Sequence, residues 1–441
     1  QEIAYLAETD PSSVSESTPL LSLGLDSIDI IKLSARLKSH GMDIKMSELF
    51  RGQTIASITQ LLQSRAGEPS KQSVREKRIE SVTAWLREHL TERGELQEGE
   101  VALPITALQE ALLSQMLDSD FTLYFNHDVL AISSQVDIPR YKAAWSAILA
   151  GEPILRTRFI PLTAELPGLK SAWCQVISPT PTVHIVEIEL QSEDELSKLT
   201  EAATLRARKV AGKADLVQLA FATVGEKTFV VLSLAHALYD GWSLGLIHRA
   251  VWEAYEGRYS PPELDAYLAQ VQEVLLFPKK GNNDNDDDDA AAFWAGFLQG
   301  TRQTLYPRRS PTRSDETHRA ELTSSVPSEQ LTAFLKSHAI TLQTLTQSLW
   351  SIHLSSTVGS LDTTFATILS LRTTLPLENL SYPTMNTVAI RSVLHGTVAN
   401  WLHYMQDNMI SVLAHGHFPL REALRVAGLT GGVLNTLFIA Q

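Results

Sequence analysis

The sequence predicts a small all-helical domain at the N-terminus, followed by a much larger domain that mixes helices and strands. A chain of 441 residues is too long for one ordinary hydrophobic core, so two or three domains are expected. Within the first 63 positions, apolar residues recur at helical spacing, most clearly from Ile28 to Leu37. From about residue 81 onward, helical and strand-like segments alternate, which predicts an α/β or α+β domain.

The small domain over residues 1–63 is predicted as a set of short helices. Apolar residues recur at spacings of three and four from Ile28 to Leu37, and residues 46–50 and 54–62 are two further helical segments. The chain begins inside an amphipathic pattern, so we expect a fragment whose first helix is truncated. Residues 64–80 are polar, contain Gly67 and Pro69, and are predicted to be a linker.

The large domain is predicted over residues 81–441. The expected helices lie at 82–90, 106–117, 244–255 and 341–354, and the expected strands at 228–234 and 364–371. Residues 281–289 are rich in Asn and Asp and lack the spaced ligands of a calcium loop, which predicts a disordered loop. This loop would separate an N-lobe at about 81–280 from a C-lobe at about 290–441.

Composition narrows the class of protein. No run of eighteen apolar residues is present, so no membrane span is expected, and no secretion signal is seen. The net charge of −13 argues against nucleic acid as a partner. One cysteine, Cys174, excludes an intramolecular disulfide and indicates a reducing, cytoplasmic compartment. Cys174 lies in a strand-like run, which favours a core side chain over a nucleophile.

A first candidate site is a serine at the start of a predicted helix. Residues 23–28 have the sequence LGLDSI, and Gly24 allows a tight turn before Ser27. An ordinary helix cap is one interpretation, since Asp and Ser are favoured at helix starts. The other is a serine that accepts a phosphate-linked group, because a helix N-terminus offers free N–H groups and a positive dipole end.

A second candidate site is a histidine between a buried strand and a helix. Residues 236–243, HALYDGWS, directly follow the apolar run that ends near residue 234. A lone histidine is more often structural than catalytic. Here the strand end would hold His236 rigidly, Asp240 follows four residues later, and Gly241 allows close approach of a ligand. Histidine is also the side chain best suited to move a proton near neutral pH.

The LGLDSI segment and the helix after it resemble the attachment motif of peptidyl carrier (thiolation) domains, which are small four-helix bundles. Many members of that family have a second glycine where this chain has Leu25, while Asp26 and Ser27 are intact. The resemblance implies that Ser27 carries 4′-phosphopantetheine, attached by a phosphopantetheinyl transferase.

His-x-x-x-Asp-Gly resembles the core motif of condensation domains of nonribosomal peptide synthetases, which are chloramphenicol-acetyltransferase-like acyltransferases. Four other segments resemble motifs of the fungal members in the same order: residues 104–110 (PITALQE), 153–159 (PILRTRF), 382–391 (YPTMNTVAIR) and 415–420 (HGHFPL). The resemblance covers about residues 101–441. The chain stops before the family's last segment ends, so the C-terminus is expected to be incomplete.

The resemblance implies two α/β lobes arranged in a V, with a tunnel between them and His236 at its middle. His236 would deprotonate or orient the acceptor amine, and the Gly241 N–H is a candidate oxyanion donor. Asp240 is implied to be structural, buried and paired with Arg372. A thioester donor is already activated, so the enzyme mainly supplies positioning and proton management.

Two further features bear on the site. Ala235 stands where the family usually has the first of two histidines; the second, His236, is the catalytic one in the family, so activity is still expected. His415 and His417 might otherwise indicate a metal, but no third ligand is in view, and no metal site is predicted.

The implied function is nonribosomal peptide synthesis, in which a donor held on Ser27 is joined by an amide bond to an acceptor amine. The expected partners are adjacent carrier and adenylation domains of the same synthetase. Ala235 and the carrier–condensation pairing also resemble hydroxamate siderophore synthetases. The alternatives are a terminal domain that releases its product by macrocyclisation and a degenerate domain that only docks partners. An epimerisation domain is a third, although its glutamate-bearing motif has no match here.

Overall fold

The computed structural model describes residues 2–7, 9–11, 14–23, 25, 29–30, 33–34, 36–37, 49, 54–65, 73–164, 171–181, 183, 185–210, 216–275, 286–306, 319–372 and 375–440. The chain forms two compact units. The first unit contains residues 1–70, 279–378 and 385–441, and the second contains residues 71–278 and 379–384. The short segment 379–384, which lies within the predicted C-lobe, therefore belongs with the N-terminal part of the large domain.

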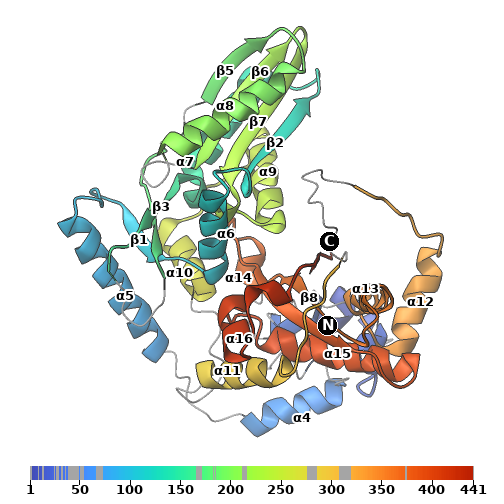
Figure 1. Cartoon of the computed structure of the whole chain (residues 1–441). Helices are drawn as coiled ribbons and strands as arrows, with labels where there is room; N and C mark the ends of the chain where they lie inside the picture. The colour runs from blue at the N-terminus through green and yellow to red at the C-terminus, as the bar shows by residue number, and fades with distance from the viewer. Residues whose placement is uncertain are drawn as a thin grey trace. The chain divides into compact units, whose positions relative to one another are not determined.

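A four-stranded sheet in the second unit carries the strand that leads to His236 (Figure 1). Its order is β2 (Phe125–Ile132), β7 (Lys227–Ala235), β6 (Val217–Val224) and β5 (Ile185–Leu190). Only β5 and β6 run parallel; the other neighbours are antiparallel. Strand β7 confirms the strand predicted over residues 228–234, and it lies between two neighbours rather than at an edge.

Helices cover both faces of this sheet. On one face, Leu199 of α8 (Glu195–Val210) packs with Ala222 and Val231. On the other, Tyr141 of α7 (Ile138–Gly151) contacts the ring of Phe221 at a centroid distance of 6.2 Å. Helix α9 (Gly241–Tyr255) packs beside α7. Because β7 is buried on both faces, its sequence is a nearly continuous apolar run instead of an alternating one.

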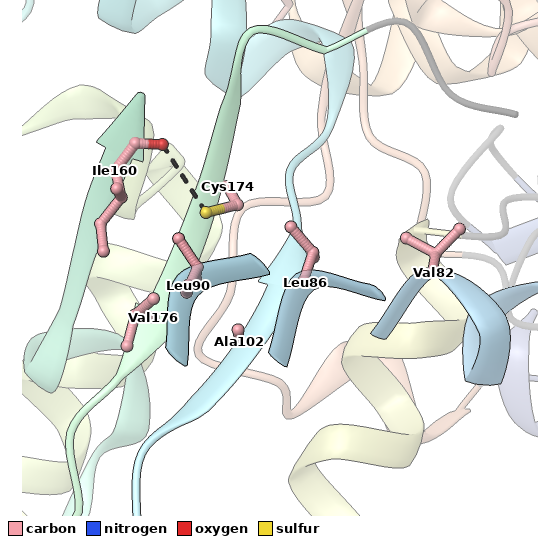
Figure 2. Close-up of a cluster of buried hydrophobic side chains, with 7 residues drawn as sticks. All are labelled: Val82, Leu86, Leu90, Ala102, Ile160, Cys174 and Val176. Carbon is pink, nitrogen blue, oxygen red and sulfur yellow. Dashed lines mark hydrogen bonds between the residues drawn. The ribbon is translucent and has the colours of Figure 1, made fainter. Parts of the chain in front are cut away.

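A second, antiparallel sheet of this unit has the order β1 (Val101–Pro104), β4 (Trp173–Ile177) and β3 (Thr157–Pro161). Helix α5 (Ser73–Glu92) packs Val82, Leu86 and Leu90 against it (Figure 2). These three residues are spaced four apart, so they share one face of the helix. The rest of the second unit comprises α6 (Ala107–Asp118), α10 (Leu264–Leu275) and the short 3-10 turns η3 (Pro153–Arg156) and η4 (His236–Leu238).

Cys174 lies in the centre of this packing, as predicted for a core side chain. It is buried, and its Sγ faces the Ile160 carbonyl oxygen at 3.6 Å (Figure 2). Burial raises the pKa of the Cys174 thiol to about 12, so the thiol stays protonated and unreactive at neutral pH.

Two local expectations differ from the structure. Helix α5 begins at Ser73, inside the predicted linker, because residues 73–80 contain strong helix formers and no Gly or Pro. The predicted disordered loop over residues 281–289 is wrong for its last part, since α11 (Asp286–Phe297) already begins at Asp286. Aspartate is favoured at helix starts, and α11 is anchored by Trp294, which is buried and donates to the His415 carbonyl.

The first unit contains a three-stranded sheet with the order β10 (Leu437–Phe438), β8 (Asp362–Leu369) and β9 (Asn386–Val393). Helices α13 (Leu342–Val358) and α15 (Val398–Ala414) pack against each other, and Gln406 accepts a hydrogen bond from Thr344 at 2.7 Å. The remaining elements of this part are α12 (Ser328–His338), α14 (Leu375–Glu378), α16 (Leu420–Val426) and η5 (Gly431–Val433).

The described residues of the N-terminal small domain are helical or in turns. They include α1 (Glu2–Leu6), η2 (Leu20–Leu23) and α4 (Ile55–Arg65), and residues 29–30, 33–34 and 36–37 are helical, in agreement with the helix predicted from residue 28. Leu25, Ile30 and Leu33 are buried. Ser27 itself lies outside the described residues. Within the described parts of the chain, every helix is too short or too polar to cross a membrane.

Candidate active site at His236

His236 directly follows β7, a central strand that is covered on both faces. Ala235, its last residue, is 0% exposed and pairs with Phe125 of β2. The His236 N–H continues the ladder by donating to the Tyr124 carbonyl at 2.7 Å. The chain then turns through η4 and starts α9 at Gly241. The sheet therefore fixes the backbone at His236. The side chain lies at the edge of the core and is half-buried.

The imidazole of His236 is held in one orientation. Its Nδ1 lies 3.0 Å from the Tyr239 carbonyl oxygen. A carbonyl can only accept a hydrogen bond, so Nδ1 carries the proton and Nε2 keeps its lone pair. The ring also stacks on the Tyr239 ring, with a centroid distance of 4.5 Å and an interplanar angle of 6°. This geometry prepares Nε2 to accept a proton.

Tyr239 is itself fixed as the platform under the imidazole. It is buried, and its hydroxyl accepts a hydrogen bond from Asn126 Nδ2 at 2.7 Å. Burial raises the pKa of the Tyr239 hydroxyl, so it remains neutral beside His236. The sequence does not indicate this role, because no spacing rule links Asn126 to a turn residue 113 positions away.

Asp240 is a structural residue of the turn. It is 4% exposed and caps α9: its Oδ1 accepts from the Ser243 N–H at 2.7 Å, and Ser243 Oγ accepts from the Asp240 N–H at 2.8 Å. This is a reciprocal capping box. Oδ2 accepts from the Thr384 N–H at 2.9 Å. The carboxylate thus accepts hydrogen bonds from two backbone N–H groups, those of Ser243 and Thr384.

Gly241 occupies the first position of α9, where backbone N–H groups have no acceptor inside the helix. Its φ is not positive, and a Cβ added there would meet no heavy atom within 4 Å among the described residues. Neither backbone strain nor packing therefore requires glycine at this position. The space at the position of the missing Cβ is open among the described residues, which fits the predicted approach of a ligand to Gly241.

A strained turn lies directly beside the imidazole and was not predicted. Asp120, Phe121 and Tyr124 all have positive φ values, of 52°, 64° and 62°. Non-glycine residues in this region cost about 1–3 kcal/mol each and persist where surrounding contacts impose them. Arg208 provides one such contact by donating to the Asp120 carbonyl at 2.9 Å. The Tyr124 ring comes to lie 6.1 Å from the His236 ring.

The roles of two other predicted site residues stay predictions. Arg372 is buried in the first unit and donates to the Leu377 carbonyl. Its predicted pairing with Asp240 stays a prediction. Ser27 lies outside the described residues, so its role also stays a prediction.

Two of the motif segments meet within the first unit. Asn386 Nδ2, from residues 382–391, donates to the carbonyls of Gly416 at 2.7 Å and Phe418 at 3.1 Å, both from residues 415–420. His415 stacks on Phe293 with a centroid distance of 4.1 Å. In the described part of the chain, no group of three or more His, Cys, Asp or Glu side chains is placed to hold a metal ion.

Comparisons with known families agree with this fold. Residues 100–439 match the condensation domain model, and residues 1–62 match the model of a phosphopantetheine attachment site. The chain therefore belongs to the condensation domain family and carries a phosphopantetheine attachment domain before it. Attachment domains of this kind hold 4′-phosphopantetheine on a serine, and condensation domains of nonribosomal peptide synthetases are amide-forming acyltransferases.

The chain is similar to short segments of fungal synthetases. Nonribosomal peptide synthetase SIDC of Beauveria bassiana is 36% identical over 444 residues, which cover 100% of this chain and 9% of the relative. Coprinoferrin synthetase of Coprinopsis cinerea is 27% identical over 89% of this chain and 15% of its own length. The chain thus spans only about a tenth of the length of such relatives.

Solved structures share the fold. The condensation domain of the monacolin K polyketide synthase MokA has a TM-score of 0.58 and 16% identity, over 77% of this chain and 78% of that one. The starter condensation domain of rhizomide synthetase, solved with C8-CoA and Leu-SNAC, has the same TM-score at 17% identity and the same coverage. The predicted fold, a carrier bundle followed by a chloramphenicol-acetyltransferase-like condensation domain, is confirmed.

Asp240→Ala is expected to destabilise the second unit strongly. It removes a helix cap and leaves the buried Thr384 N–H without its acceptor, a combined loss of about 2–4 kcal/mol. Asp137 is the matched control, because it caps α7 through the Arg140 N–H but is exposed. Asp137→Ala should cost about 1 kcal/mol. Thermal or urea unfolding measures both changes, and equal losses in the two variants would contradict the structural role of Asp240.

Proposed function

We propose that this chain forms an amide bond between an acyl donor, held as a thioester on Ser27, and an acceptor amine, with His236 as the proton acceptor. The observation that carries the proposal is the His236 imidazole at the end of β7, whose Nδ1 faces the Tyr239 carbonyl and whose Nε2 is left basic. A general base of this kind contributes about 10²–10⁴-fold to a rate.

The chain's own residues account for the proton transfer and the developing charge. Nε2 of His236 accepts a proton from the acceptor amine or orients that amine for attack. As the C–N bond forms, the C–S bond of the donor thioester breaks, and the proton taken from the amine passes to the departing sulfur, which leaves as a thiol. The Tyr239 carbonyl stabilises the resulting imidazolium, because it accepts from Nδ1–H at 3.0 Å in both charge states. The Gly241 N–H, at the positive end of α9, is placed to donate to an oxyanion. Asp240 keeps His236 and Gly241 in register by capping the helix.

Ser27 fits the attachment of 4′-phosphopantetheine. Among the described residues near it in the sequence, Leu25 before it and Ile30 and Leu33 after it are buried. The Ser27 hydroxyl supplies the oxygen of the phosphodiester. When attached, the group supplies a thiol that holds the acyl donor. A carrier placed N-terminal to a condensation domain presents the donor, so the cargo of Ser27 is the donor chain.

Ala235 does not remove this chemistry. The position is 0% exposed inside β7, so its side chain lies in the core and does not share the exposure of His236. A histidine at this position would have to fit a packed interior. Amide formation is therefore proposed in preference to a docking role without catalysis or to macrocyclising release.

The wider context follows from the same resemblance. We propose that the chain acts in a fungal nonribosomal peptide synthetase in the cytoplasm, with adjacent carrier and adenylation domains and a phosphopantetheinyl transferase as partners. Hydroxamate siderophore assembly is the proposed pathway class. The resemblance of the sequence to such synthetases and the similarity to coprinoferrin synthetase support it.

His236→Ala should slow amide formation by about 10²–10⁴-fold without unfolding the chain. The assay loads Ser27 with an aminoacyl donor from coenzyme A, adds an excess of a soluble aminoacyl thioester, and follows the dipeptide by mass spectrometry. His248→Ala is the control, because His248 is another half-buried histidine of the same unit, bonded to Asp128 at 2.7 Å. A folded His236→Ala protein that matches the control in rate refutes the proposal.

Gly241→Ala should slow the same reaction by about 10²-fold, because the added methyl hinders access to an oxyanion donor. Gly245 is an ideal control: it lies one turn further along α9, is exposed, and likewise has nothing near its missing Cβ among the described residues. Both substitutions should raise helix stability by about 0.4–1 kcal/mol. The oxyanion role is wrong if the Gly241 and Gly245 variants react at equal rates.

Ser27→Ala should abolish attachment of phosphopantetheine. Incubation of the chain with a broad-specificity phosphopantetheinyl transferase and coenzyme A should add the mass of one arm, measured on the intact protein. Ser22→Ala, which alters a nearby serine of the same domain, should still be modified. A Ser27→Ala protein that gains the same mass would show that another residue is the attachment site.

A further inference from the structure

A buried chain of side-chain hydrogen bonds leads from the second sheet to the turn that holds His236. It starts at Gln175 of β4, passes through Tyr382 and ends at Gln109 of α6; all three are 0–1% exposed. Gln175 Nε2 donates to the Tyr382 hydroxyl at 2.8 Å, and that hydroxyl donates to Gln109 Oε1 at 2.8 Å. Gln109 Nε2 then donates to the carbonyl of Ala237, the residue after His236, at 3.0 Å.

The direction of every bond in this chain follows from its partners. The Thr106 N–H can only donate, and it lies 2.9 Å from the Gln109 side-chain oxygen, which fixes that atom as Oε1. The Pro104 carbonyl can only accept, and it lies 2.8 Å from Nε2 of Gln175. Tyr382 must therefore accept from Gln175 and donate to Gln109. Hydrogen bonds aligned in this way polarise one another in a dry interior.

The segment that carries Tyr382 contacts the turn at a second point. Thr384, two residues later, donates its N–H to Asp240 Oδ2 at 2.9 Å. The same segment is fixed by Ser381, which donates to the buried Glu152. Residues 379–384 thus hold the turn at both of its ends: at the Ala237 carbonyl through Gln109, and at Asp240 directly. Gln109 and Tyr382 belong to two of the motif segments, residues 104–110 and 382–391, whose sequences do not by themselves indicate that they are in contact.

We propose that Tyr382 is a positioning residue for the condensation reaction, which acts by holding the His236–Asp240 turn through Gln109. The inference rests on the proposed function of His236. Tyr382 acts through another residue: its hydroxyl and the Thr106 N–H together hold the Gln109 amide, which in turn fixes the Ala237 carbonyl. A displacement of about 1 Å at a reacting group can cost about 10²-fold in rate. Burial raises the pKa of Tyr382, so the donor proton is retained at every practical assay pH.

Tyr382→Phe is the first test, because it removes only the hydroxyl. It should lower kcat by about tenfold or more while KM for the soluble acceptor stays within about twofold, since positioning acts on the reacting group and not on binding. Tyr267→Phe is the matched control: Tyr267 is buried in the same unit, and its hydroxyl has no hydrogen-bond partner in the described structure. A kcat for folded Tyr382→Phe equal to that of the control overturns the proposal.

Gln109→Glu is the second test and does not depend on how well Tyr382→Phe folds. The introduced carboxyl keeps acceptors for Thr106 and Tyr382 but donates to the Ala237 carbonyl only when protonated. Burial raises the pKa of such a group, so the ratio of variant to wild-type kcat should fall as pH rises through that pKa. A ratio that does not change between pH 5.5 and 8.5 (about the range where folded chains are stable) contradicts the proposal.

Hydrogen–deuterium exchange separates this inference from the proposed function. If the wild-type chain and the Tyr267 variant both form no amide, the proposed function fails, and exchange in residues 236–243 still decides the positioning claim. Faster exchange there in Tyr382→Phe than in Tyr267→Phe supports it. Equal exchange in the two variants overturns it, whatever the rates of amide formation.

Discussion

The Asp240 carboxylate is the constraint on which the arrangement of the site depends. It caps α9 through Ser243 and accepts from the Thr384 backbone, so one buried group joins the end of the strand–turn segment to the start of the helix and to a distant part of the chain. Burying a carboxylate costs free energy unless its oxygens accept hydrogen bonds. Both oxygens of Asp240 accept from backbone N–H groups. The positions of His236 and Gly241 therefore depend on the hydrogen bonds of this carboxylate.

The sheet makes the backbone at His236 rigid, and the turn after it sets the orientation of the imidazole. Strand β7 is covered on both faces, so its end cannot move without disturbing packed apolar side chains. Beyond the strand, the Tyr239 carbonyl and ring determine which imidazole nitrogen is protonated and which direction the ring faces. Many functional sites are built in this way, with the reacting residue on a loop and a rigid sheet that holds the loop in place.

Local sequence patterns predicted the main elements of the site. They could not predict the tertiary contacts that hold these elements in place. The apolar run at 228–234 and the HALYDGWS sequence placed a histidine between a strand and a helix, because strand burial and helix capping are local properties. Tyr382 reaches Gln109 from far along the chain, and such pairing depends on the tertiary fold alone. The positive φ of Tyr124 could not be predicted from the sequence either, since a non-glycine residue adopts such a φ only when tertiary contacts impose it. The start of α11 differs from the expected loop, because aspartates that repel one another in an extended chain are also favoured at a helix start.

The protonation state of His236 tests the central claim most directly. Two-bond ¹H–¹⁵N spectra of the histidine-labelled chain, with His236 assigned by comparison with His236→Ala, report which ring nitrogen carries the proton in the neutral imidazole. The account predicts a single tautomer with the proton on Nδ1 and a bare Nε2, because Nδ1 faces the Tyr239 carbonyl at 3.0 Å. A neutral imidazole protonated on Nε2, or an averaged mixture of the two tautomers, would contradict it.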